Sequence, residues 1–173
     1  QYRGASVLIA VDFKGDDEKI EADVVKLASR HGVLDKLLMI GRAISIPEVR
    51  KRLKAADAET QCAQVANRPE EFSAALNNAA ADWVYLRYIP SADEVRQAHD
   101  RGKRVFLAGP TVAGNQPQNW RRCASRGVDA VLTDYSIELA RQLRSDRRHA
   151  AELRELLAPH FVPPEEFRDT GKF

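Results

Sequence analysis

The sequence contains little cysteine and no hydrophobic run long enough to cross a membrane. Its two cysteines, Cys62 and Cys123, stand in no metal-ligand spacing, so no disulfide framework is indicated and we expect two small buried residues. No segment approaches the roughly 20 apolar residues of a transmembrane helix. An initiator methionine is also absent, and a start at Gln1 suggests a processed, trimmed or partial chain.

The sequence also lacks a large excess of positive or negative charge. The 27 basic and 25 acidic residues leave a formal net charge of +2. A protein that binds nucleic acid usually has a strongly basic face, so this balance favours no nucleic-acid partner. Hydrophobic residues make up 44% of the 173, which is enough for one sizeable core and argues against a disordered chain.

What the sequence does contain is a regular alternation of short apolar runs and helical patterns. The runs cover residues 7–13, 37–40, 61–66, 83–88, 105–108 and 130–133. A helical pattern follows each run, and the helix after 83–88 opens with the capping-box residues Ser91 and Glu94. This alternation predicts parallel strands joined by right-handed crossovers. We expect the domain to cover residues 1–160 and an irregular tail to cover 161–173.

Two architectures are compatible with six such units. An open doubly wound sheet of six strands would be complete at this length. A closed eight-stranded (β/α) barrel needs about 250 residues, so this chain would lack roughly two units. The periodicity does not choose between them, because both place parallel strands against helices.

In both architectures functional groups lie at the C-terminal ends of the strands, where the βα loops gather. The residues that the sequence places there are Asp12, Lys14, Arg87, Gly109, Pro110 and Asp134. Asp12 and Lys14 stand two apart on one strand and project from the same face, either as a metal-and-phosphate pair or as an ion pair. Arg87 either binds a ligand or pairs with a carboxylate. Asp134 either shapes a site or caps the next helix.

Three segments resemble, in order, parts of the glycerophosphodiester phosphodiesterase family. The segment 127–135 (GVDAVLTDY) resembles the family's closing strand, and 98–110 (AHDRGKRVFLAGP) resembles the helix and strand before it. The segment 11–14 (VDFK) stands where the family has an E-x-K motif. The resemblance covers most of residues 5–140. It implies a TIM-type (β/α) barrel in which about six βα units are present and the first two are absent.

The resemblance also implies an activity, namely metal-dependent hydrolysis of a small phosphodiester to an alcohol and glycerol phosphate, a reaction of lipid metabolism. Asp12 matches the acidic residue of E-x-K, a ligand to a divalent cation, and its oxygens suit Mg²⁺ or Ca²⁺. Lys14 matches the lysine near the substrate phosphate, and Arg87 is a second candidate for phosphate binding. Asp134, Gly109 and Pro110 are expected to shape the site, the last two at the start of a long loop.

The family's two catalytic histidines and its other metal carboxylates belong to the first two βα units. The four histidines of this chain are His31, His99, His149 and His160. We expect all four to be solvated or packing residues, so the chain by itself is predicted to be inactive. An incomplete barrel also leaves two sheet edges, which further residues or a second copy of the chain would cover.

Two other hypotheses remain beside the enzyme. The chain is either a non-catalytic, degenerate barrel that binds a phosphate ligand or a partner, or an unrelated doubly wound module that binds an anion. The Asp in place of Glu at position 12 favours the first of these. The order and separation of the three matching segments oppose the second. The sequence does not determine the substrate head group, the metal or the compartment.

Overall fold

The computed structural model describes residues 8–15, 17–108 and 116–157. The chain divides into two compact units, residues 1–134 and residues 135–173. The described part of the second unit is the helix α7 (Ser136–Leu157). The expected boundary at residue 160 and the tail 161–173 lie outside the described residues, so that division stays a prediction. In the described ranges no helix combines the length and apolar character that a membrane crossing requires.

Within the described part of the first unit, six parallel strands form one sheet in strict chain order. The strands are β1 (Ile9–Phe13), β2 (Leu37–Gly41), β3 (Gln61–Ala66), β4 (Trp83–Leu86), β5 (Arg104–Leu107) and β6 (Ala130–Val131). A doubly wound sheet reverses its strand order at a switch point, and no reversal occurs between β1 and β6. The expected incomplete (β/α) barrel is therefore confirmed, and the doubly wound alternative is excluded.

The sheet is curled, so that its first and last strands approach each other. Leu8, which precedes β1, and Ala130 of β6 line one cavity. In a flat sheet these two strands would stand roughly 24 Å apart, five spacings of about 4.8 Å. At the C-terminal ends, Asp12 of β1 and Leu132, which follows β6, line another common cavity, so these ends gather around one mouth.

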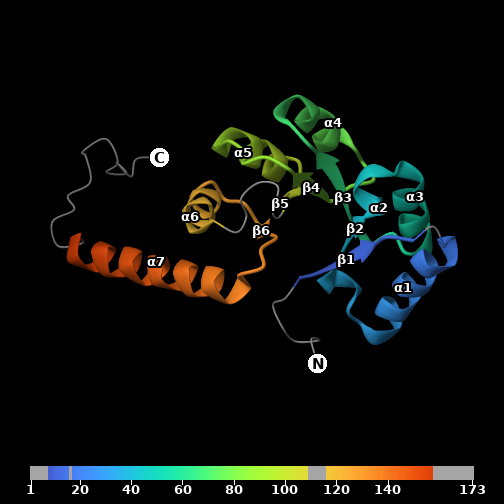
Figure 1. Ribbon diagram of the computed structural model, residues 1–173, viewed down its shortest axis with the longest axis horizontal. Coiled ribbons are helices and arrows are strands. Elements are labelled where there is room, and N and C mark those ends of the chain that lie inside the picture. Colours follow the sequence, from blue (N-terminus) through green and yellow to red (C-terminus); the bar gives the residue numbers. More distant parts are fainter. Residues whose placement is uncertain (1–7, 16, 109–115, 158–173) are drawn as a thin grey trace, which may run out of the picture. The chain divides into compact units, whose positions relative to one another are not determined.

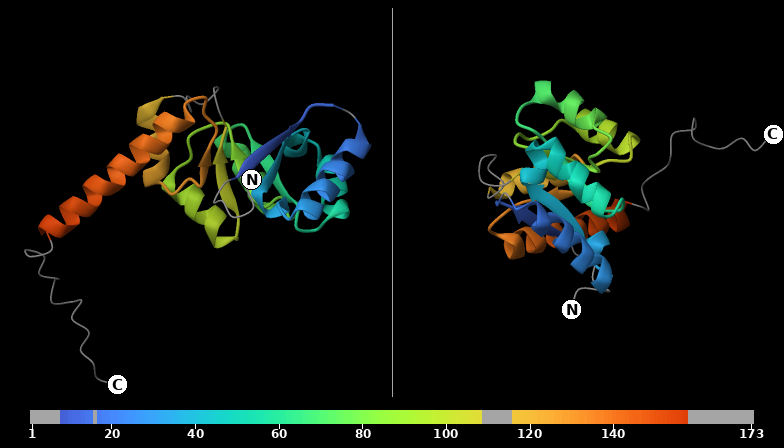
Figure 2. Two further views of the ribbon diagram at one scale, coloured as in Figure 1. Left: turned by 90° about the horizontal axis from the view of Figure 1, so that it is seen from below. Right: turned by 90° about the vertical axis from the view of Figure 1, so that its right-hand side faces the viewer.

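Helices lie along the outer side of the curled sheet (Figure 1). They are α1 (Glu18–His31), α3 (Pro47–Ala56), α4 (Phe72–Asn77), α5 (Ala92–Asp100) and α6 (Pro117–Ser125), with the short turns η1 (Leu34–Lys36), α2 (Arg42–Ser45) and η2 (Pro69–Glu71) between elements. Helices α1 and α3 pack against each other, side by side in Figure 2. The expected capping box is present, because Ser91 Oγ accepts from the Glu94 amide and Glu94 Oε2 accepts from the Ser91 amide.

Burial on both faces explains the nearly continuous apolar runs of the strands. In β2, Leu37 and Met39 belong to the outer cluster with the helices α1 and α3. Leu38 and Ile40 belong instead to an inner cluster, which also contains aromatic residues of β4 and β5. Cys62 and Cys123 are free and buried, as expected. Burial raises the pKa of the Cys62 thiol to about 12, so this thiol is unreactive at neutral pH.

Gly41 lets the end of β2 approach the end of β1 closely. Its φ is +69°, a conformation that favours glycine. A Cβ at this position would lie 2.5 Å from the carbonyl oxygen of Phe13 and 2.7 Å from its amide nitrogen. Both are backbone atoms, which cannot move aside without distorting β1. Since Phe13 pairs with Gly41 and Asp12 with Ile40, this contact positions the segment that carries Asp12.

We predict that Gly41→Ala lowers the free energy of unfolding by about 3 kcal/mol or more, because it adds a backbone clash to left-handed strain. The matched control is Gly102→Ala. Gly102 also has φ +69°, but a Cβ there would have no atom within 4 Å. We expect this control to lose about 1 kcal/mol, the cost of the strain alone. Urea unfolding followed by circular dichroism measures both changes, and equal losses would show that Gly41 makes no special contact.

Candidate functional site

The candidate site is a cavity of about 640 Å³ at the C-terminal ends of the strands. Its polar lining includes Asp12, Lys14, Arg42, Asn67, Tyr85 and Arg87. Leu132, which follows β6, lines the same cavity as Asp12 of β1, so the mouth is shared by both ends of the sheet. Three of the residues expected from the sequence, Asp12, Lys14 and Arg87, are thus brought together by the fold.

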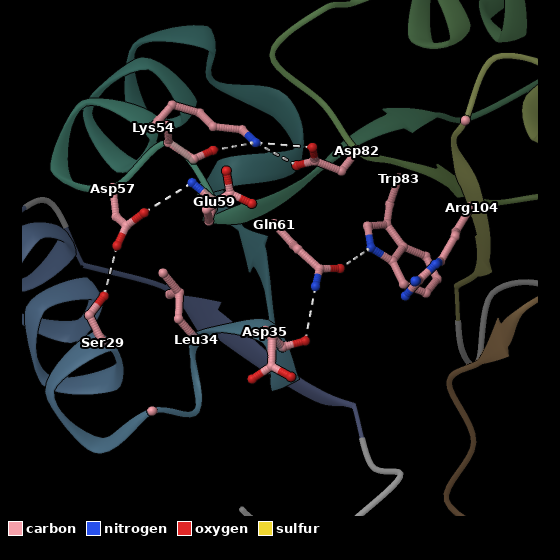
Figure 3. A pocket seen from close by; sticks show the side chains of 13 residues that line it. Ser29, Leu34, Asp35, Lys54, Asp57, Glu59, Gln61, Asp82, Trp83 and Arg104 are labelled. Atoms are coloured by element: carbon pink, nitrogen blue, oxygen red, sulfur yellow. Dashed lines mark hydrogen bonds and ion pairs between the residues drawn. The ribbon is translucent and has the colours of Figure 1, made fainter.

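A second cavity, of about 730 Å³, lies at the opposite, N-terminal ends of the strands (Figure 3). Its polar groups largely satisfy one another. Lys54 Nζ lies 2.9 Å from Asp82 Oδ2. The Gln61 side chain accepts from Trp83 Nε1 at 2.8 Å and donates to the Asp35 carbonyl at 2.9 Å. Because this end of such barrels serves stability rather than chemistry, we place the candidate site in the first cavity.

Asp12 and Lys14 form an ion pair, with 3.4 Å between Lys14 Nζ and Asp12 Oδ2. The two side chains are 45% and 83% exposed, so water screens their attraction and leaves both accessible to a ligand. The ion pair that the sequence left open as an alternative is therefore present. It does not exclude a binding role, because an exposed pair exchanges partners at little cost.

Arg87 is oriented by an asparagine rather than by a carboxylate. Its Nη1 donates to Asn67 Oδ1 at 3.1 Å. Asn67 is itself held by Glu71, whose Oε2 accepts from the Asn67 amide at 2.9 Å and from Asn67 Nδ2 at 2.8 Å. These two bonds, with a smaller contribution from Arg68, hold the pKa of Glu71 below its usual range. Because the Asn67 side chain is neutral, this hydrogen bond does not compensate the positive charge of Arg87.

Arg42 is a cavity residue that the sequence reasoning missed. It begins α2 directly after Gly41, and its Nη1 donates to the Gly15 carbonyl at 2.6 Å. This bond ties the loop after β2 to the loop after β1. The rule that polar residues at strand ends face the site applies to Arg42 as well as to Lys14. The signal was therefore present in the sequence at residue 42.

Of the remaining expected site residues, only Asp134 lies in the described part of the chain. Asp134 stands at the end of the first unit, two residues before α7, and is not among the lining residues. Gly109 and Pro110 lie outside the described residues. Their expected site-shaping role stays a prediction.

None of the described histidines lines the cavity. His31 ends α1. His99 on α5 lies 2.9 Å from Asp129 Oδ2, which also accepts from the Val105 amide. His149 on α7 lies 3.9 Å from Glu152. His160 is outside the described residues.

The described residues do not complete a metal site. Among the described residues, no group of three histidine, cysteine or acidic side chains is arranged to hold a metal ion. Asp12 is the one carboxylate in the described lining of the cavity. Since Mg²⁺ and Ca²⁺ take about six to eight oxygen ligands, Asp12 supplies at most a small part of such a set.

We predict a lowered pKa for Glu71, with a defined dependence of stability on pH. A lowered folded-state pKa means that the Asn67–Glu71 bonds stabilise the fold above the unfolded-state pKa and are lost as pH falls through the folded-state value. NMR titration of the carboxyl carbons measures this pKa. Asn67→Ala should raise it toward the ordinary value of about 4.3, and Asn77→Ala, a control on α4, should not. An ordinary Glu71 pKa in the unaltered chain would contradict the hydrogen-bond arrangement.

Comparison with known proteins identifies the fold. No family model and no curated protein matches this chain. Among solved structures, it is similar to a protein assigned as a glycerophosphodiester phosphodiesterase from Galdieria sulphuraria, with a TM-score of 0.64 and 17% identity over 79% of this chain and 57% of that one.

Two further structures give the same result. The chain matches the glycerophosphodiester phosphodiesterase of Agrobacterium tumefaciens str. C58 with a TM-score of 0.55 and 16% identity, over 77% of this chain and 54% of that one. It matches a glycerophosphoryl diester phosphodiesterase of Parabacteroides distasonis ATCC 8503 with a TM-score of 0.57 and 12% identity, over 80% and 50% of the two chains. The chain thus spans about half the length of these structures, and it has the fold of the corresponding part of the phosphodiesterase barrel.

Proposed function

We propose that this chain is the larger part of a metal-dependent phosphodiesterase that hydrolyses a glycerophosphodiester to an alcohol and glycerol phosphate. The observation that carries the proposal is the meeting of Asp12, Lys14 and Arg87 in one cavity of a barrel with the phosphodiesterase fold. Asp12 lies on β1, Lys14 follows β1 and Arg87 follows β4, and the curl of the sheet brings them to one cavity.

Each of the three residues has a role suited to its chemistry. Lys14 provides a compact, exposed positive charge for a phosphate oxygen. Arg87, held by Asn67, offers planar N–H donors that suit two oxygens at once. Asp12 provides one hard oxygen ligand for a divalent cation. When bound, that cation would neutralise charge on the phosphoryl oxygens.

The proton-transfer groups of this proposal come from residues outside the 173 of this chain. Support comes from the positions of His31, His99 and His149, none of which lines the cavity. Within the described residues, β1 and β6 are the edge strands of the sheet, and each is paired on one side only. Each of them has backbone groups free to pair with a further strand. Further strands of the same protein, or a second copy of the chain, would supply the partners for these edges.

The alternative function is a non-catalytic barrel that binds a phosphate ligand through the same cavity. The pairing of Asp12 with Lys14 favours it, because an aspartate neutralised by lysine leaves the other cations for an anionic ligand. The two functions differ in whether turnover occurs and whether a metal is needed.

We predict that Asp12→Asn or Lys14→Ala, made in the full-length gene product, lowers metal-dependent release of glycerol phosphate by about 100-fold or more. The matched controls are Asp35→Asn and Lys36→Ala, which alter an ion pair of 3.3 Å before β2, away from the cavity. These controls should keep full activity. Unchanged activity in both site variants would refute the assignment of Asp12 and Lys14.

The 173-residue chain alone should show no turnover of glycerophosphocholine with either Mg²⁺ or Ca²⁺. The reason is that no described histidine stands at the cavity to move a proton. A coupled assay for glycerol 3-phosphate measures the rate. Hydrolysis by this chain above the rate without protein would show that other residues transfer the proton.

A further inference from the structure

Arg50 is a buried arginine that no step of the proposed chemistry uses. It lies on α3, its side chain is only 2% exposed, and its Nη1 donates to the Ala43 carbonyl at 2.6 Å. Its Nε is one of two buried side-chain atoms in the described residues that lack a hydrogen-bond partner. Leaving such a donor unpaired lowers stability, so an apolar side chain of similar size would fill this space more favourably. The bond to Ala43 is therefore the feature that needs an arginine here.

The ionisation of Arg50 is consistent with a permanent donor. Burial is the largest influence and lowers the pKa of its guanidinium group, while Cys62 and Glu48 raise that pKa to a smaller extent. Arginine nevertheless keeps its proton in proteins. Because hydrogen bonds from a charged donor are stronger than those from a neutral one, the bond to the Ala43 carbonyl is a firm anchor.

The Ala43 carbonyl needs an outside donor because of the proline that follows its turn. Ala43 belongs to α2, a single turn in which the Ile46 amide donates to the Arg42 carbonyl at 2.9 Å. In a continuing helix the next bond would run from the amide of residue 47 to the Ala43 carbonyl. Residue 47 is a proline, which has no N–H, and it begins α3 instead. Arg50 thus supplies the donor that Pro47 lacks.

The α2 turn is part of the wall of the candidate cavity. Arg42, Ile44 and Ser45 line this cavity. Ala43 belongs to the outer core cluster and Ile44 to the inner one, so the turn crosses from one face of the sheet to the other. A single turn is too short to be stable by itself and keeps its shape through contacts with its surroundings. The bond from Arg50 is such a contact, and it determines where this wall stands.

We infer that Arg50 is a positioning residue for the candidate site, which holds the α2 turn in the cavity wall by donating to the Ala43 carbonyl in place of the amide that Pro47 lacks. The inference rests on the proposed function only in treating this cavity as the site. It concerns the wall itself and requires neither a metal nor turnover. Arg50 acts through the backbone of α2, because it is buried and is not among the residues that line the cavity.

Amide hydrogen exchange, followed by NMR on the 173-residue chain, tests this role. The Ile46 amide reports the opening of α2, since it forms the internal bond of the turn. Arg50→Met, which keeps an apolar side chain in this space, should speed the exchange of Ile46 relative to that of Val84 on β4 by about tenfold or more. Arg50→Lys, which restores a cationic donor, should recover part of the protection.

Leu53→Ala is the matched control for a loss of core packing. Leu53 lies on the same helix, is fully buried and belongs to the outer core cluster. This variant should lower the urea midpoint at least as much as Arg50→Met, yet it should keep the ratio of Ile46 to Val84 exchange within about twofold of its original value. An unchanged ratio in Arg50→Met would overturn the inference. An equal rise of the ratio in Leu53→Ala would also overturn it, because general destabilisation would then explain the effect.

Kinetics of the full-length protein separate this inference from the proposed hydrolysis. Arg50→Met should raise the KM for glycerophosphocholine about fivefold or more and change kcat less than about twofold, because the wall positions the substrate and transfers no proton. Leu53→Ala should leave KM unchanged. An unchanged KM in Arg50→Met would overturn the positioning role. Absence of turnover in the unaltered full-length protein would instead contradict the proposed function, and hydrogen exchange alone would then decide the role of Arg50.

Discussion

The pairing of each strand with the next one along the chain is the constraint on which the structure depends. Parallel strands joined in this order twist in one direction, and the sheet curls until its first and last strands line common cavities. Gly41 permits the close approach of β2 to β1, next to the segment that carries Asp12. In a flat sheet, Asp12 at the end of β1 and Arg87 after β4 would stand three strands apart.

The charged side chains of the candidate site differ in how many contacts hold them in place. Arg87 is anchored by the neutral side chain of Asn67, so this anchor adds no opposite charge, and one bond of Arg42 goes to the Gly15 carbonyl. Lys14 is exposed and shares its charge with Asp12. The described lining of the cavity therefore holds more basic than acidic side chains.

Barrel enzymes take their functional groups from the ends of several strands. This chain spans about half the length of solved phosphodiesterases with a similar fold, so it contains a part of the strand ends of such a barrel. The part held here is rich in cations and contains one carboxylate in its described lining. Its inner surface is stabilised by stacked aromatic rings, and Tyr85 belongs both to that core and to the cavity wall.

The sequence by itself determined the alternation of strands and helices, the capping box at Ser91 and the placement of Asp12, Lys14 and Arg87 at strand ends, because these depend on local periodicity and on neighbouring residues. The local pattern did not decide whether the sheet curls, since barrels and open sheets share it; the family resemblance predicted the barrel, and the tertiary structure confirmed it. It also decided the partner of Arg87 and the position of Tyr85 in the cavity wall. Such properties depend on which residues meet across strands about 20 residues apart, and no local pattern specifies that.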